Sequence, residues 1–131
     1  MFVGPDPVGS DSFSAPYIHI TGAGFKDFVS FGELAAPTTV QALLERNSLH
    51  PSQCTMLCHQ TSLSIIQAWQ TALTGITILH TLPTYGNLEI AAIPVNLDQL
   101  GSQIKTDYLV TLGLGVQLQA GALLFTRAPA T

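Results

Sequence analysis

Two polar side chains, an imidazole and a carboxamide, follow the ends of two consecutive predicted strands. His59 comes directly after the apolar segment Thr55–Cys58, and Asn87 lies about one strand-and-helix unit later, in Tyr85-Gly86-Asn87. Because both groups can donate hydrogen bonds, they suit the stabilisation of negative charge on one carbonyl or enolate oxygen. We expect them to converge at the carboxyl edge of the sheet, where open α/β sheets place their ligand sites.

Each of these residues also has a purely structural interpretation. The His59 ring could simply bond a nearby backbone group, and asparagine is a common N-cap residue at the start of a helix. The other histidines fit structural or surface roles, because His19 and His80 lie within predicted strands and His50 precedes a proline. The hypothesis of a site therefore depends on the pair and not on either residue alone.

The elements that must position this pair follow from the apolar pattern. Predicted strands cover residues 17–20, 55–58, 76–82, 108–112 and 122–126, and predicted helices cover residues 25–46, 61–74 and 88–103. A kink or restart is expected at Pro37, which cannot donate within a helix. The alternation predicts an α/β domain over residues 16–131, with a layered, mixed five-stranded sheet and helices, after a flexible leader at residues 1–15.

The helix over residues 61–74 has the clearest signals. Thr61 or Ser62 is a candidate N-cap, and Gly75 is a candidate C-terminal stop. An apolar stripe on this helix is predicted to face the sheet, and it consists of Ile65, Ile66, Trp69, Ala72 and Leu73. We therefore assign Trp69 to the core and not to a binding surface.

The composition indicates that much of the surface is covered by something else. Charged residues make up 9% of the chain, against about 25% in ordinary soluble proteins. The uncharged surface would lie against another subunit or the rest of a larger polypeptide. Four basic residues and a net charge of −4 argue against binding to nucleic acid or to an anionic membrane. Without a signal peptide or a spanning apolar run, we expect a cytoplasmic protein.

Both cysteines, Cys54 and Cys58, fall in one predicted strand. Four strand residues separate them by roughly 13 Å, which is beyond disulfide reach. A strand cannot wrap a metal ion with these two side chains, so we expect buried free thiols and neither a metal nor a cofactor.

Several collinear stretches between Tyr17 and Arg127 carry a family resemblance. They are Ser48–Ser52, Leu57–Gln60 with Ile65-Ile66, Tyr85–Asn87, Ala91–Pro94, Ile104–Asp107, Gly113–Gly115 and Gly121–Leu124. Together they resemble the C-terminal half of 3-oxoacyl-(acyl-carrier-protein) synthase III, a condensing enzyme of the thiolase fold. The resemblance implies a thiolase-like half-domain from an acyltransferase of fatty acid synthesis.

The resemblance also implies roles for particular residues. His59 and Asn87 would hydrogen-bond the malonyl thioester oxygen during decarboxylative Claisen condensation, and the backbone of Gly115 and Val116 would line the acyl oxyanion pocket. The family's nucleophilic cysteine lies in the N-terminal half. Cys58 cannot replace it, since neighbouring strand residues point to opposite faces. The implied partners are that missing half, an acyl thioester on carrier protein or coenzyme A, and a second copy in a homo-oligomer.

Some positions depart from the family pattern and leave alternatives open. Ser64 stands where the family has a carrier-docking arginine, Leu88 and Glu89 replace small hydroxyl residues, and Val116 and Gln117 replace glycines. These departures favour two other hypotheses: a non-catalytic scaffold or acyl-binding subunit, or a related condensing enzyme that uses coenzyme A thioesters. In each case we expect the isolated chain to lack condensing activity. Gly113–Gly115 is predicted as a turn between the last two strands.

Overall fold

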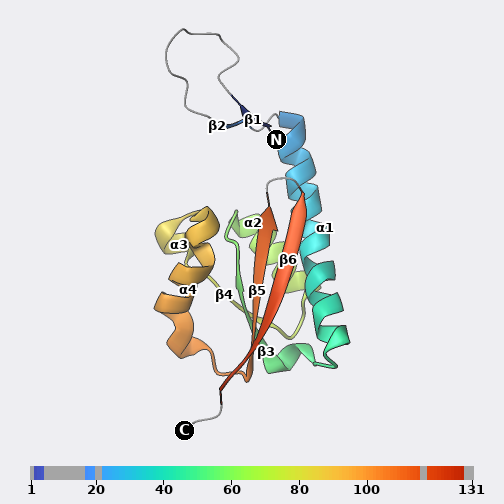
Figure 1. The fold of residues 1–131 in the computed structure, drawn as a ribbon, viewed down its shortest axis with the longest axis vertical. Helices are drawn as coiled ribbons and strands as arrows, with labels where there is room; N and C mark the ends of the chain where they lie inside the picture. Colours follow the sequence, from blue (N-terminus) through green and yellow to red (C-terminus); the bar gives the residue numbers. More distant parts are fainter. Residues whose placement is uncertain (1, 5–16, 20–21, 116–117, 129–131) are drawn as a thin grey trace.

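A four-stranded mixed sheet forms the centre of the fold (Figure 1). The computed structural model describes residues 2–4, 17–19, 22–115 and 118–128. The strand order is β4-β3-β5-β6, with bounds Thr77–Leu79, Cys54–Cys58, Tyr108–Gly115 and Gln119–Thr126 respectively. Strand β3 runs parallel to β4 and β5, and β6 runs antiparallel to β5. The carboxyl ends of β3, β4 and β5 therefore share one edge of the sheet.

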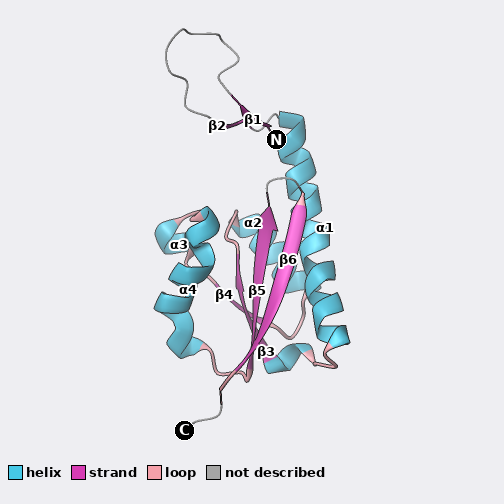
Figure 2. Cartoon of the chain, viewed as in Figure 1, coloured by secondary structure: helices cyan, strands magenta, loops and turns pink. Residues whose placement is uncertain are grey.

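Helices cover both faces of this sheet (Figure 2). The α-helices are α1 Gly22–Arg46, α2 Leu63–Ala72, α3 Leu82–Tyr85 and α4 Ala92–Leu100. Short 3-10 helices are η1 Pro51–Gln53, η2 Glu89–Ala91 and η3 Gly101–Gln103. The main core joins α1 and α2 to one face of the sheet, and α4 contacts β3. Every residue of β3 is buried, as expected for a strand that is covered on both faces.

Local chemistry explains the limits of α2. The Ser62 hydroxyl oxygen accepts a hydrogen bond from the Ile65 backbone N–H at 3.3 Å, which confirms Ser62 as the N-cap. Gly75 has a φ of +99°, a conformation that favours glycine after a helix. Trp69 is fully buried, as predicted, and its indole Nε1 donates to the Gly32 carbonyl at 2.8 Å. The predicted stripe is buried except for Ala72, which is exposed.

The prediction of five strands in one sheet is wrong. The first expected strand corresponds to β2, Tyr17–His19, which pairs antiparallel with β1, Phe2–Gly4, in a separate two-stranded sheet. Strand β1 lies inside the predicted leader, while residues 5–16 are outside the described part of the chain. The two strands are close in the sequence, so bringing them together costs little loop-closure entropy.

Three further differences lie at or near prolines. Helix α1 continues through Pro37, so the expected restart does not occur, and the Thr38 hydroxyl bonds the Leu34 carbonyl at 2.9 Å. The predicted 76–82 strand ends early because α3 begins at Leu82, with Pro83 in its first turn. Pro94 lies in the first turn of α4, where a missing N–H is tolerated. The predicted 88–103 helix is divided into η2, α4 and η3.

The glycine segment near the end of the chain is strand and not turn. Gly113 and Gly115 lie in β5 and pair with Gly121 and Gln119 of β6. A Cβ atom at Gly115 would come within 3.2 Å of the Gln119 Cβ, so a glycine keeps this pairing close. The ladder therefore extends three residues beyond the predicted end of the strand. Within the described residues, no helix has the length and apolar character needed to cross a membrane.

Candidate active site

His59 stands immediately beyond the carboxyl end of β3. Its backbone N–H donates to the Leu112 carbonyl of β5 at 2.8 Å, so the main chain here is still held by the sheet. The side chain is half-buried, and its ring makes no hydrogen bond with any described residue. The structural alternative, a ring tied to local backbone, is therefore not observed among these residues. The ring N–H remains available to a ligand.

Asn87 follows α3 in the loop after β4. Gly86, with a φ of +69°, ends α3 and donates its N–H to the Leu82 carbonyl at 2.9 Å. The Asn87 side-chain oxygen accepts from the Glu89 backbone N–H at 2.9 Å, which supports the start of η2. Asn87 therefore partly fills the helix-capping role that asparagine commonly has, because its side-chain oxygen bonds an N–H in the first turn of η2. Its Nδ2 has no hydrogen-bond partner in the described part of the chain, so its donors remain free.

The structure brings the loops of these two residues together. The Gln60 Nε2 donates to the Gly86 carbonyl oxygen at 2.8 Å, which joins the residue after His59 to the residue before Asn87. The Glu89 carboxylate is also close enough to influence the His59 ring electrostatically. No hydrogen bond links His59 to Asn87 among the described residues. The loops of His59 and Asn87 are therefore joined through Gln60 and Gly86, and neither donor is engaged within the described residues.

The His59 environment favours a neutral ring. Burial lowers the pKa of His59 below its ordinary value of 6.5, and the Glu89 carboxylate acts in the opposite direction with the smaller effect. A histidine with a lowered pKa is uncharged near neutral pH and carries one N–H donor. This arrangement suits hydrogen bonding to a developing oxyanion.

The cysteines of β3 cannot serve as nucleophiles. Both thiols are free and buried, as predicted. Burial raises the pKa of Cys58 to about 12 and also raises the pKa of Cys54. Because the thiolate is the reactive form, these groups stay inert near neutral pH. A cysteine nucleophile for thioester chemistry would therefore have to come from outside the described residues.

The predicted backbone site at Gly115 and Val116 is described only in part. Gly115 is half-buried at the carboxyl end of β5, on the same edge of the sheet as His59. Val116, like the neighbouring Gln117, lies outside the described residues. The position of Gly115 is compatible with a backbone contact near the site.

A buried polar cluster beside the two loops was not predicted. Gln60 and Asn96 are fully buried, and Thr81 is 7% exposed. Gln60 belongs to the motif that we singled out, but Thr81 was assigned to a strand and Asn96 to an ordinary helix. Helix α4 also carries Asp98 and Gln99, so no sequence signal distinguished Asn96 from an exposed polar residue.

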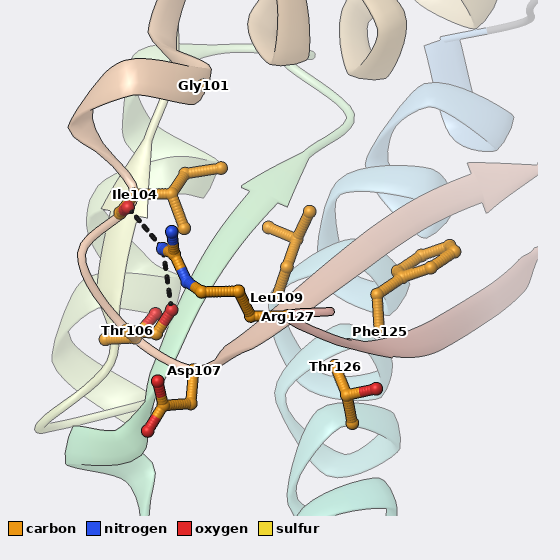
Figure 3. A pocket seen from close by; sticks show the side chains of 8 residues that line it. All are labelled: Gly101, Ile104, Thr106, Asp107, Leu109, Phe125, Thr126 and Arg127. Atoms are coloured by element: carbon orange, nitrogen blue, oxygen red, sulfur yellow. Dashed lines mark hydrogen bonds between the residues drawn. The ribbon is translucent and has the colours of Figure 1, made fainter. Parts of the chain in front are cut away.

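A cavity lies at the other edge of the sheet (Figure 3). It measures about 200 Å³ and is lined by Gly101, Ile104, Thr106, Asp107, Leu109, Phe125, Thr126 and Arg127. The Arg127 Nη2 donates to the carbonyl oxygens of Ile104 and Thr106 at 2.7 and 3.1 Å. These residues lie just before or at the start of β5, or at or just after the end of β6, so the cavity is separate from His59.

Comparisons with known proteins point to one enzyme. Beta-ketoacyl-[acyl-carrier-protein] synthase III from Synechococcus sp. (strain WH7803) is 31% identical over 105 residues, which cover 76% of this chain and 31% of that protein. The crystal structure of synthase III from Thermus thermophilus matches 99% of this chain and 41% of the Thermus chain, with a TM-score of 0.72 and 22% identity. The crystal structure of 3-oxoacyl-(acyl carrier protein) synthase III from Pseudomonas aeruginosa PAO1 matches 99% of this chain and 44% of the Pseudomonas chain, with a TM-score of 0.73 and 20% identity. No family model matches the chain.

The resemblance to a part of synthase III is confirmed. The thiolase-like α/β class is confirmed with it, with four strands in the main sheet in place of the expected five. The chain spans 31% of the length of the curated synthase III and 41% to 44% of these two solved synthase III chains.

Proposed function

We propose that this chain is the C-terminal part of a synthase III-like acyltransferase of fatty acid synthesis, with His59 and Asn87 as donors to a malonyl thioester oxygen. The observation that carries this proposal is the 2.8 Å contact between Gln60 and Gly86, which holds the two donor loops side by side. The free His59 ring and the free Asn87 Nδ2 support it. The similarity to synthase III supplies the reaction class.

The chemistry begins with loss of carbon dioxide from the malonyl group. The bond between the carboxylate carbon and the α-carbon breaks, and its electron pair forms an enolate whose charge rests largely on the thioester oxygen. Hydrogen bonds from His59 and Asn87 stabilise this oxygen, each by about 3 kcal/mol for a well-placed donor. The enolate carbon then attacks an acyl group held on a cysteine of the missing half. That thiolate leaves, and a 3-oxoacyl thioester remains.

The chain alone can be tested on the first half of this sequence. Decarboxylation needs the enolate donors but not the nucleophile, because the enolate can take a proton and yield acetyl thioester. We expect the purified chain to decarboxylate malonyl coenzyme A slowly and to form no condensation product. His59→Ala should lower the decarboxylation rate by about 100-fold. His50→Ala, at an exposed histidine on η1, is the matched control and should have no effect.

The scaffold hypothesis predicts a different outcome of the same assay. It is favoured by the Glu89 carboxylate near His59 and by the exposed Ser64, whose hydroxyl bonds only Ser62, at 3.0 Å, where the family has an arginine. A decarboxylation rate that is the same for the chain, its His59→Ala variant and buffer would support a scaffold or acyl-binding subunit. Saturation by malonyl coenzyme A without carrier protein would favour the related coenzyme A enzyme.

The partners that we propose are the N-terminal half of the fold and a second copy of the enzyme, in the cytoplasm. Strand β6 supports a partner on this side of the sheet. None of its residues is buried, although the strand belongs to the central sheet. Leu123 and Phe125 on this strand are 63% and 48% exposed. An open strand edge with exposed apolar side chains is a typical site for another polypeptide. Size measurement of the chain with and without the N-terminal half tests this assembly.

A further inference from the structure

Gln60 links the two proposed donors through a single peptide bond. It follows His59 directly, and its buried Nε2 donates to the Gly86 carbonyl oxygen at 2.8 Å. That carbonyl belongs to the peptide group whose nitrogen is the backbone nitrogen of Asn87. The preceding peptide group is also held, since the Gly86 N–H donates to the Leu82 carbonyl at 2.9 Å. The backbone that leads to Asn87 is therefore held by hydrogen bonds on both sides of Gly86.

Two donors fix the orientation of the Gln60 side-chain amide. Its Oε1 accepts from the Asn96 Nδ2 at 3.1 Å and from the Thr81 backbone N–H at 3.2 Å. An inverted amide would place N–H groups against N–H groups at these positions and would point its oxygen at the Gly86 carbonyl. The neighbours of Gln60 thus select the orientation in which Nε2 faces Gly86.

Asn96 is oriented in turn by Thr81. The Thr81 hydroxyl donates to the Asn96 Oδ1 at 2.8 Å, and the Thr81 backbone N–H lies 3.0 Å from the same oxygen. The hydroxyl oxygen also accepts from the Gln60 Nε2 at 3.3 Å. The three side chains come from the end of β3, the segment after β4, and α4. They form a closed network in which each side chain has partners.

We infer that this network of Gln60, Thr81 and Asn96 positions the Asn87 donor relative to His59. The inference rests on the proposed function, and these three are positioning residues that act through the Gly86 peptide. Burying three polar side chains costs free energy that an apolar cluster would avoid, and a fully satisfied network compensates by fixing one arrangement. The arrangement that it fixes here is the distance between two loops at the carboxyl edge of the sheet.

The test compares substitutions at two buried threonines, of which only Thr81 belongs to the network. Thr81→Val removes a hydroxyl from the network. Thr55→Val is the matched control, because Thr55 is 2% exposed and its hydroxyl lies 2.8 Å from the Thr106 hydroxyl, near the other edge of the sheet. Thr81→Ser keeps the hydroxyl and should restore the network. Asn96→Leu is a second way to break it, if Thr81→Val does not fold.

Hydrogen exchange is the first readout. We expect Thr81→Val and Asn96→Leu to speed exchange of the Gly86 and Glu89 amides by at least about tenfold, since both amides are bonded within this loop. The Leu73 amide at the C-cap of α2, which is bonded to the Trp69 carbonyl at 2.8 Å, should keep its exchange rate. Thr81→Ser and Thr55→Val should resemble the unchanged chain.

The kinetics of malonyl coenzyme A decarboxylation are the second readout. We expect Thr81→Val to lower kcat by about tenfold or more with little change in KM, because a misplaced donor weakens transition-state stabilisation. Unchanged loop exchange in folded Thr81→Val and Asn96→Leu would overturn the inference. Faster exchange with unchanged kcat would overturn it as well. If decarboxylation does not depend on His59 at all, the proposed function fails, and the exchange result still decides whether the network orders the loop.

Discussion

The two edges of the central sheet use polar groups in opposite ways. At the carboxyl edge, the buried amide of Gln60 is fully engaged, whereas the donors of His59 and Asn87 have no partner among the residues that the structure describes. At the other edge a cavity of about 200 Å³ is present, but the Arg127 Nη2 beside it already donates hydrogen bonds to two loop carbonyls. The site that we propose therefore does not coincide with this cavity. It is argued instead from fixed surroundings and from donors that have no partner among the described residues.

The largest expected difference between the edges is in catalysis. Asn87→Asp replaces the free amide donor with a carboxylate, which repels the enolate oxygen. We expect malonyl coenzyme A decarboxylation to fall by about 100- to 1,000-fold. Arg127→Gln at the other edge should leave the rate within about twofold. A large loss with Arg127→Gln and none with Asn87→Asp would reverse the assignment of the edges.

The edges should also differ in stability. Gln60→Glu places a carboxylate against the Gly86 carbonyl in a fully buried position. We expect it to lower the free energy of unfolding by about 3 kcal/mol at neutral pH, because an unpaired buried acceptor loses its hydration. Arg127 is exposed, and Arg127→Gln should cost less than about 1 kcal/mol. Urea unfolding of the two variants measures the difference, and equal losses would contradict it.

The smallest expected effect is on the titration of His59. Glu89→Gln removes the carboxylate that raises the pKa of His59, so this already lowered pKa should fall further. The folded chain then holds the neutral ring more strongly than the unfolded chain does. The stability that this provides is complete above the ordinary value of 6.5 and is lost as the pH falls toward the folded pKa.

Nuclear magnetic resonance titration of the His59 imidazole measures this shift. Asp107→Asn at the other edge is the control and should leave the His59 pKa unchanged. An upward shift in Glu89→Gln would show that the carboxylate does not act on the ring as described.

Apolar periodicity predicted the parts of the fold that burial of apolar side chains determines. It located α2 within the expected range 61–74, the core position of Trp69 and the fully buried β3. The N-cap was narrowed by residue type to Thr61 or Ser62, and the structure selects Ser62. It failed where the pairing of backbones determines which sheet a strand joins, since β2 pairs with β1 outside the main sheet. It also ended β5 too early, because glycines that suit a turn suit a close strand ladder equally well.

The two donors of the proposed site were chosen from the sequence and stay a prediction, whereas the buried cluster beside them was not predicted. The resemblance to synthase III implied the roles of His59 and Asn87, and the structure places Asn87 after α3 and not directly after a strand. Thr81 and Asn96 carry no sequence signal, because a polar residue in a sequence normally indicates exposed surface. Only the tertiary contact between α4 and the strand ends shows that they are buried partners of Gln60.

Reconstitution of the complete reaction tests the central claim most directly. The chain is mixed with the separately expressed N-terminal half of the Synechococcus synthase III relative, and condensation of acetyl and malonyl thioesters is measured. We predict that condensation appears only in the mixture and falls by about 100-fold when the chain carries His59→Ala. A reconstituted rate that is unchanged by His59→Ala would contradict the account.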